Sequence, residues 1–192
     1  MNKRYKIFMA IFLILIIVIG ITIYLKRNSK YPKAKIITSE GTIIVQLFPD
    51  KAPKTVANFE KYANENFYNG LVFHRIIPNF MIQGGGLYAN GSVKPTYAPI
   101  PLESNNNLSN TKGTIAMART SSPNSATSQF FINTVDNTFL DHSKLSPGYA
   151  VFGKVIKGMN VVNKISASPT TTKYGMQNWP VKNIIIYSVE LK

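Results

Sequence analysis

The sequence predicts a mainly β domain, an antiparallel barrel or sandwich, preceded by a membrane-spanning helix. Three observations predict it: short apolar runs recur between turn residues, two stretches carry the apolar spacing of helices, and a long uncharged run stands near the start of the chain. The chain has 192 residues, of which 16% are charged and 45% hydrophobic. This length and composition suit one globular domain with a terminal extension, and they exclude a disordered chain or a coiled coil.

The uncharged run covers residues 7–25 and follows a basic flank at residues 1–6. As a helix it would rise about 28 Å, close to the hydrocarbon thickness of a bilayer. Its end, Tyr24-Leu25-Lys26-Arg27, does not resemble the small-residue cleavage site of a signal peptide. We therefore predict an uncleaved signal anchor, a single-pass transmembrane helix, with a linker over residues 26–33. Basic residues flank both ends almost equally, with a slight excess after the run, so the positive-inside rule gives little support for export.

Residues 34–192 are expected to form a single domain that begins with a hairpin. Ala34–Thr38 and Thr42–Phe48 are rich in apolar residues and flank the turn sequence Ser39-Glu40-Gly41. Further short apolar runs, each bounded by turn residues, predict strands over Leu71–Ile77, Phe80–Gln83, Thr114–Arg119, Gln129–Asn133, Ala150–Val155 and Asn183–Leu191.

Two helices are predicted between these strands. The first begins near Pro53, which suits the first turn of a helix, and its apolar face is formed by Val56, Phe59, Ala63 and Phe67. The second, Met159–Ile165, follows Gly158. The polar stretches Ser104–Lys112 and Ser166–Pro180 are expected to be connections without regular structure.

Composition excludes several kinds of chemistry. Lys and Arg number 22 against 8 for Asp and Glu, a net charge of +14, but the lysines of the domain are scattered, which favours a solvated basic surface and no nucleic-acid partner. Cysteine is absent, so disulfides, thiol nucleophiles and cysteine-bound zinc are excluded. With only His74 and His142 among scattered acids, we expect no metal site and no cofactor. The run Gly84-Gly85-Gly86 lacks the sequence of a phosphate loop and is expected to supply a turn with positive φ.

One segment places a guanidinium among large apolar side chains. Phe73–Gly85 contains a single arginine, Arg75, and a single glutamine, Gln83. Alone, such an arginine would be interpreted as a snorkelling side chain and its apolar neighbours as core. However, this segment, together with Met117-Ala118-Arg119, Ser128–Asn133, Phe139-Leu140-Asp141 and Tyr149–Val155, closely resembles the active-site blocks of cyclophilin-type peptidyl-prolyl cis–trans isomerases, in the same order. The resemblance covers residues 34–192. Within the family, this sequence resembles the bacterial branch, which includes exported members.

The resemblance implies a fold and a set of roles. It implies a closed eight-stranded antiparallel β-barrel capped by two α-helices, with a peptide groove on the outer face. Arg75 matches the catalytic arginine of the family. The substrate-binding positions, which form the proline pocket and border the groove, match Phe80, Met81, Gln83, Ala118, Arg119, Gln129, Phe131, Phe139, Leu140 and Tyr149.

Four further expectations concern single residues. Phe139 stands where many members carry a tryptophan that binds cyclosporin, and Tyr149 where many carry a histidine, which puts drug sensitivity and peptide preference in question. His74 is expected to be structural, because rotation about a peptide bond needs no general base. Phe130 alternates with Phe131 along a strand, so it should face into the barrel.

These expectations lead to a functional hypothesis: a prolyl isomerase that assists protein folding and acts on proline-containing polypeptides. The alternative is a peptide-binding or holdase chaperone on the same fold, for which turnover is irrelevant. Retention of Arg75 and Gln83 favours the enzyme, since a binder would need only the apolar pocket. We expect a monomeric domain on a single-pass anchor in a bacterial inner membrane, facing the periplasm, where exported chains fold.

Overall fold

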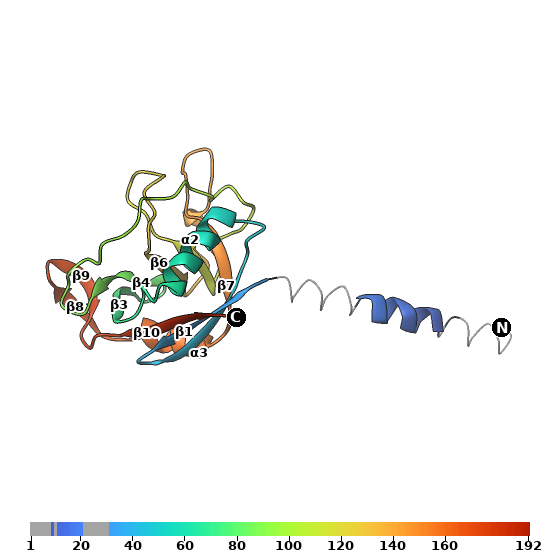
Figure 1. The fold of residues 1–192 in the computed structure, drawn as a ribbon, viewed down its shortest axis with the longest axis horizontal. Coiled ribbons are helices and arrows are strands. Elements are labelled where there is room, and N and C mark those ends of the chain that lie inside the picture. The colour runs from blue at the N-terminus through green and yellow to red at the C-terminus, as the bar shows by residue number, and fades with distance from the viewer. Residues whose placement is uncertain (1–8, 10, 21–30) are drawn as a thin grey trace. The chain divides into compact units, whose positions relative to one another are not determined.

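The computed structural model describes residue 9, residues 11–20 and residues 31–192 (Figure 1). Lys33–Lys192 forms one compact unit, separate from the residues that precede it. Its β-strands in chain order are β1 (Lys33–Thr38), β2 (Gly41–Leu47), β3 (Leu71–Ile77), β4 (Met81–Tyr88), β5 (Thr114–Met117), β6 (Phe130–Asn133), β7 (Val151–Lys157), β8 (Thr170–Lys173), β9 (Met176–Pro180) and β10 (Ile186–Leu191). Its helices are α2 (Pro53–Asn64), the 3-10 helix η1 (Thr138–Leu140) and α3 (Met159–Ser166).

Eight strands form one antiparallel sheet in the order β10-β1-β2-β7-β5-β6-β4-β3. The two end strands approach each other through an isolated bridge between Val72 and Ile185. Two backbone bonds flank that bridge, from the Gly70 N–H to the Ile186 carbonyl at 2.9 Å and from the Phe73 N–H to the Ile184 carbonyl at 3.0 Å. The barrel predicted by the family resemblance is therefore nearly closed, and a short bridge instead of a full ladder joins its last two strands.

A hairpin that the sequence did not predict lies within the expected connection Ser166–Pro180. Strands β8 and β9 pair with each other through the register Lys173↔Met176. Both residues between them, Tyr174 and Gly175, have positive φ, which gives the two-residue turn that suits the twist of a hairpin. Strand β8 is polar and has no buried residue, and in β9 only Trp179 and Pro180 are buried, so neither strand has the apolar alternation that marks a half-buried strand.

Helix α2 begins where the sequence predicts, with Pro53 in its first turn. The carboxylate of Glu103, from the long loop after β4, accepts hydrogen bonds from the Lys54 N–H at 3.1 Å and the Thr55 N–H at 2.8 Å. An acid at this end satisfies backbone donors that the helix leaves unpaired and opposes its positive dipole end. Val56, Phe59 and Ala63 are buried as predicted.

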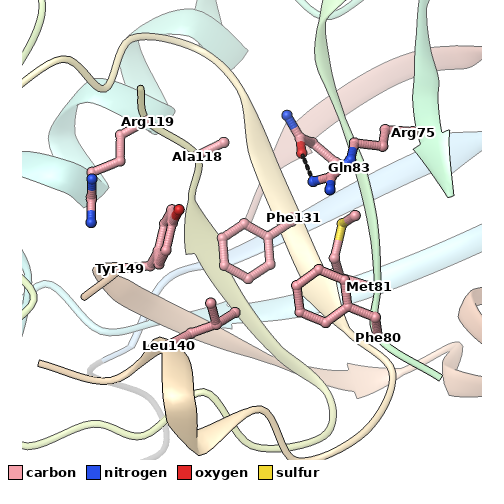
Figure 2. Close-up of a pocket in the computed structure, with 9 residues that line it drawn as sticks. All are labelled: Arg75, Phe80, Met81, Gln83, Ala118, Arg119, Phe131, Leu140 and Tyr149. Atoms are coloured by element: carbon pink, nitrogen blue, oxygen red, sulfur yellow. Dashed lines mark hydrogen bonds between the residues drawn. The ribbon is translucent and has the colours of Figure 1, made fainter. Parts of the chain in front are cut away.

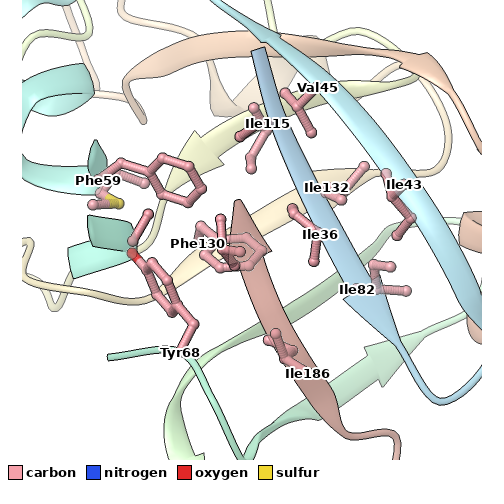
Figure 3. Packing of buried hydrophobic residues seen from close by; sticks show 14 of the residues in the cluster. Ile36, Ile43, Val45, Phe59, Tyr68, Ile82, Ile115, Phe130, Ile132 and Ile186 are labelled. Atoms are coloured by element: carbon pink, nitrogen blue, oxygen red, sulfur yellow. The ribbon is translucent and has the colours of Figure 1, made fainter. Parts of the chain in front are cut away.

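The main core fills the barrel (Figure 3). Isoleucines from several strands meet Phe59 of α2 and Phe130 of β6, and Phe130 is fully buried as the alternation of β6 predicts. The outward side chains of the same strands form a second buried cluster made of Met81, Ala116, Phe131 and Val151. Alternation along β4 and β6 therefore supplies both the core and an apolar patch on the outside of the barrel.

The predicted anchor at residues 7–25 lies partly outside the described residues. Residue 9 and residues 11–20 are helical, and their large apolar side chains are about half exposed. No helix among residues 9, 11–20 and 31–192 combines the length and the apolar character needed to span a bilayer.

Candidate active site

A pocket of about 220 Å³ opens over the outer apolar cluster (Figure 2). Strands β3, β4 and β6 contribute Arg75, Met81, Gln83 and Phe131, and η1 contributes Leu140. The remaining lining residues lie just outside strands and are Phe80, Ala118, Arg119 and Tyr149. Nine of the eleven residues predicted for the site from the sequence therefore line one pocket.

The other two predicted residues lie beside the pocket. Gln129 accepts a hydrogen bond at its Oε1 from the Nε2 of Gln83, at 2.9 Å. Phe139 is 69% exposed, and its ring stacks on Phe80 with the centroids 5.8 Å apart and the planes 21° from parallel. Gln129 thus supports the lining, whereas Phe139 extends its apolar surface outward.

Arg75 stands at one side of the apolar floor and Arg119 at the other (Figure 2). The Nη1 of Arg75 donates to the Oε1 of Gln83 at 3.3 Å, so the series Arg75–Gln83–Gln129 runs along the pocket wall. The bond to Gln83 restrains the guanidinium, which is otherwise a flexible group. A guanidinium has five N–H donors, and this bond leaves others for a ligand.

Arg119 has a different environment. Its Nε donates to the Gly148 carbonyl at 2.9 Å and its Nη1 to the Thr120 carbonyl at 2.8 Å, while the guanidinium lies 4.5 Å from the centre of the Tyr149 ring. These contacts fix the loop that ends at Tyr149. We infer that Arg119 shapes the pocket, because two of its donor nitrogens serve backbone carbonyls.

His74 lies next to Arg75 but faces the protein interior, with 6% of its surface exposed. Burial lowers the pKa of His74 to about 4, and the charge of Arg75 acts in the same direction. Its Nδ1 has no hydrogen-bond partner in the part of the chain that the structure describes. The imidazole is therefore neutral near pH 7, and Arg75 supplies the positive charge on this side of the pocket.

The glycine run after Gln83 continues strand β4 and makes no separate turn. Gly85 has a φ of +85°, as expected for one member of the run. Gly86 does not have positive φ, but a Cβ placed there would lie 2.5 Å from the Cγ of Gln129. The absent side chain at Gly86 therefore leaves the space that Gln129 occupies when it bonds Gln83.

We expect Gly86→Ala to lower kcat/KM for a short X–Pro peptide about 2- to 10-fold. The methyl group displaces Gln129 and removes its hydrogen bond to Gln83, worth about 0.5–1.5 kcal/mol. The measurement is a protease-coupled isomerisation assay. If the effect passes through Gln129, Gly86→Ala adds little in a Gln129→Ala background, and a fully additive double variant contradicts this explanation.

Two residues that sequence reasoning did not assign a role hold Leu140 in place. Asp141 accepts at Oδ1 from the Asn110 backbone N–H at 2.7 Å and from the Asn110 Nδ2 at 2.9 Å. The same Nδ2 lies 3.2 Å from the Leu140 carbonyl. Asn110 and Asp141 are 31 positions apart, so no local pattern could reveal the pair.

Asn137 has a similar role on the opposite side of η1. Its Nδ2 donates to the Phe80 carbonyl at 2.8 Å and to the Asn133 Oδ1 at 2.8 Å. The Phe80 carbonyl also accepts from the Thr134 N–H at 3.0 Å, so Phe80 is held to the end of β6 as well as to this buried amide. In the residues that the structure describes, no three histidine or acidic side chains come together as a metal site would require.

The fold and the pocket define a class of protein: a β-barrel that carries on its outer surface a pocket with an apolar floor, bordered by the guanidinium groups of Arg75 and Arg119. Residues 33–191 match the family described as "Cyclophilin type peptidyl-prolyl cis-trans isomerase/CLD". The chain belongs to this family and is a cyclophilin-type peptidyl-prolyl cis–trans isomerase.

Several relatives are similar over the same domain. A peptidyl-prolyl cis-trans isomerase of Acinetobacter baylyi is 59% identical over 156 residues, which cover 81% of this chain and 82% of that protein. Peptidyl-prolyl cis-trans isomerase B of Escherichia coli is 51% identical over 155 residues, 79% of this chain and 94% of that protein. A crystal structure of a Cryptosporidium parvum cyclophilin in the presence of the dipeptide Ala-Pro has a TM-score of 0.69 at 28% identity and covers 82% of this chain and 96% of that chain.

Proposed function

We propose that Arg75 carries the isomerisation by donating a hydrogen bond to the prolyl nitrogen of a twisted X–Pro bond. The observation that carries the proposal is the guanidinium restrained by Gln83 at the edge of an apolar pocket. When the bond rotates, the nitrogen lone pair leaves conjugation with the carbonyl and becomes a better acceptor. A donor aimed at that nitrogen stabilises the twisted state more than either planar state, which is the requirement for catalysis.

The energy required is compatible with one such bond and a pocket. A barrier of about 20 kcal/mol gives a rate of about 0.01 per second, and a turnover of about 10 per second needs the barrier lowered by about 4 kcal/mol. A hydrogen bond from a charged donor contributes about 1.5–3 kcal/mol. Fixing the substrate in a water-poor pocket accounts for the remainder. No proton transfer is needed, which fits a buried, neutral His74.

The prolyl ring is assigned to the apolar floor. Met81 and Phe131 are nearly fully buried at 2% and 4% exposure, and Leu140 and Phe80 pack against them. A ring held here is within reach of Arg75 on one side, and the rest of the peptide runs toward Ala118 and Tyr149 on the other. The pocket of about 220 Å³ is large enough to hold a prolyl ring.

This assignment predicts where a bound peptide lies. In NMR spectra of the domain with a short X–Pro peptide, we expect nuclear Overhauser contacts between the prolyl ring protons and both the Met81 methyl and the Phe131 ring. A matched peptide with alanine in place of proline should show neither contact. Prolyl contacts confined to residues outside the pocket would contradict the assignment.

We further propose that residues 7–25 anchor the enzyme in a bacterial inner membrane, with a monomeric catalytic domain in the periplasm. Support comes from nineteen consecutive uncharged residues and from the exposed apolar side chains of the helical residues 11–19. A prolyl isomerase fixed at that surface would meet exported chains as they emerge and fold.

The absence of cysteine makes the orientation directly measurable, because any introduced thiol is unique. In intact cells with a permeable outer membrane, we expect a membrane-impermeant maleimide to label Lys182→Cys. The matched variant Asn2→Cys should react only after the inner membrane is opened. The reverse pattern places the domain in the cytoplasm and contradicts the proposal, while loss of both proteins from the membrane fraction in alkaline carbonate contradicts the anchor itself.

A further inference from the structure

The outer face of strands β1, β2 and β7 carries a cluster of lysines that the active site does not use. In β1 the odd positions point outward, because Ala34 and Ile36 between them are fully buried. Residues that face one another across neighbouring strands form a row. In the first row, Lys33 of β1 pairs with Gln46 of β2, and Gln46 pairs with Lys154 of β7. Residues paired in this way have their side chains side by side on one face.

The next row repeats the pattern. Lys35 pairs with Ile44, and Ile44 pairs with Lys157. We define the basic face as the four lysines of these two rows, Lys33, Lys35, Lys154 and Lys157. One acid adjoins it, Glu190 of β10, which pairs with Lys35 and forms an ion pair with it at 3.3 Å. No ion pair among the described residues involves the other three lysines.

The part of the basic face on β1 and β2 lies on the wall of the barrel opposite β4 and β6, whereas β7, which carries Lys154 and Lys157, is two places from β6 and connects the two sides. In the strand order β10-β1-β2-β7-β5-β6-β4-β3, β1 is four places from β6 and β2 is four places from β4. In a ring of eight strands, four places is the opposite wall. The outward side chains of β4 and β6 form the floor of the pocket, so Lys33 and Lys35 of β1 point away from it.

Chain connectivity places the start of this face near the proposed anchor. Lys33 is both the first residue of β1 and the last residue of the predicted linker, residues 26–33. Eight residues span at most about 28 Å when fully extended. Such a tether keeps the domain close to the bilayer, and a lysine cluster is the surface that anionic headgroups attract.

We propose that the basic face docks the domain on anionic lipid headgroups of the membrane that holds its anchor, which directs the active site away from the membrane and toward soluble chains. The geometry rests on the proposed anchor, but the affinity of the face for lipid can be measured without it. Each lysine close to an anionic surface raises partition about five-fold. Removing three should therefore lower it about a hundred-fold.

The test uses the domain from Tyr31 onward. The E. coli relative is matched over 94% of its own length by this domain, so the domain suffices for a complete protein of the family. The binding variant is the triple change Lys33→Gln, Lys154→Gln and Lys157→Gln. The matched control removes the same charge from exposed positions off this face, with Lys61→Gln, Lys144→Gln and Lys182→Gln.

Binding is measured by co-sedimentation with phosphatidylcholine vesicles that contain or lack phosphatidylglycerol. We expect the wild-type domain to bind only the anionic vesicles, less so at high salt, with about a hundred-fold loss in the binding variant and less than ten-fold loss in the control. Isomerase activity on a short peptide should be unchanged in both. Equal losses in the two variants, or no binding by the wild type, would overturn the proposal.

A second arm separates failure of the face from failure of the anchor. The full chain is placed in vesicles with fluorescent headgroups, and energy transfer is measured from a dye at Ile44→Cys and, separately, at Leu145→Cys. We expect strong transfer from Ile44→Cys alone. If the chain stays in the membrane after alkaline carbonate, strong transfer from both positions or from neither contradicts the docked orientation. If carbonate releases the chain, the anchor is contradicted. In that case the vesicle binding of the isolated domain alone tests whether the basic face binds lipid.

Discussion

Arg75→Ala should lower kcat/KM for a short X–Pro peptide about 10- to 150-fold while leaving the fold intact. The range is the loss of one charge-assisted hydrogen bond, about 1.5–3 kcal/mol, converted into a rate ratio. The side chain lies at the pocket wall and not in the core, and among the described residues it makes one hydrogen bond, to Gln83 at 3.3 Å. A protease-coupled assay measures the rate, and circular dichroism with urea unfolding checks the fold.

Peptide affinity distinguishes catalysis from binding in the same variant. A donor that acts on the twisted state changes turnover more than ground-state affinity. We therefore expect Arg75→Ala to bind the peptide within a few-fold of wild type, whereas Phe131→Ala should weaken binding because it opens the apolar floor. Arg75→Lys keeps the charge but loses the planar fork, and it should restore only part of the activity. A variant with near-normal turnover would remove Arg75 from the mechanism.

Much of this architecture could be predicted because its determinants are local. The hairpin of β1 and β2 follows from two alternating runs around a turn, and α2 follows from Pro53 and a 3.6-residue apolar period. The separation of Phe130 from Phe131 needed only the two-residue period of a strand. Motif resemblance then brought together pocket residues from distant segments, which local patterns alone could not do.

The features that escaped prediction depend on contacts between distant segments. The pair of Asn110 and Asp141 fixes Leu140 through a loop whose sequence is simply polar. The hairpin of β8 and β9 is polar, and its main apolar contribution is Trp179, which is fully buried beside Val72 and Leu87. The space left by Gly86 for Gln129 is visible only when two strands are side by side.

His74 has the second large predicted effect, on stability and not on catalysis. We expect the free energy of unfolding to fall by about 2 kcal/mol between pH 7 and pH 5 because of this residue alone. The pKa of His74 is about 4 in the folded protein and about 6.5 in the unfolded chain. Between these values the unfolded state binds a proton that the folded state does not, so stability rises with pH there. The contribution is complete above pH 6.5 and is lost as the pH falls toward 4, with a total of about 3 kcal/mol.

The physical cause is burial of a ring that has no acidic partner to stabilise its charge. The imidazole lies beside Trp179, with 6.1 Å between ring centres, and the guanidinium of Arg75 repels a second cation; hydrogen bonding to the Val72 backbone and to Gln129 opposes the lowering of the pKa but does not cancel it. Urea unfolding at a series of pH values, on wild type and on His74→Phe, measures the effect. Phenylalanine keeps a planar ring and does not titrate, so the variant should show a shallower pH dependence between pH 5 and 7, whatever its stability at pH 7. Exposed His142 is present in both proteins and cancels in the comparison. Parallel curves of unfolding free energy against pH for the two proteins would show that His74 takes up its proton equally in the folded and unfolded states. If the phenyl ring disturbs packing, His74→Gln provides the same comparison.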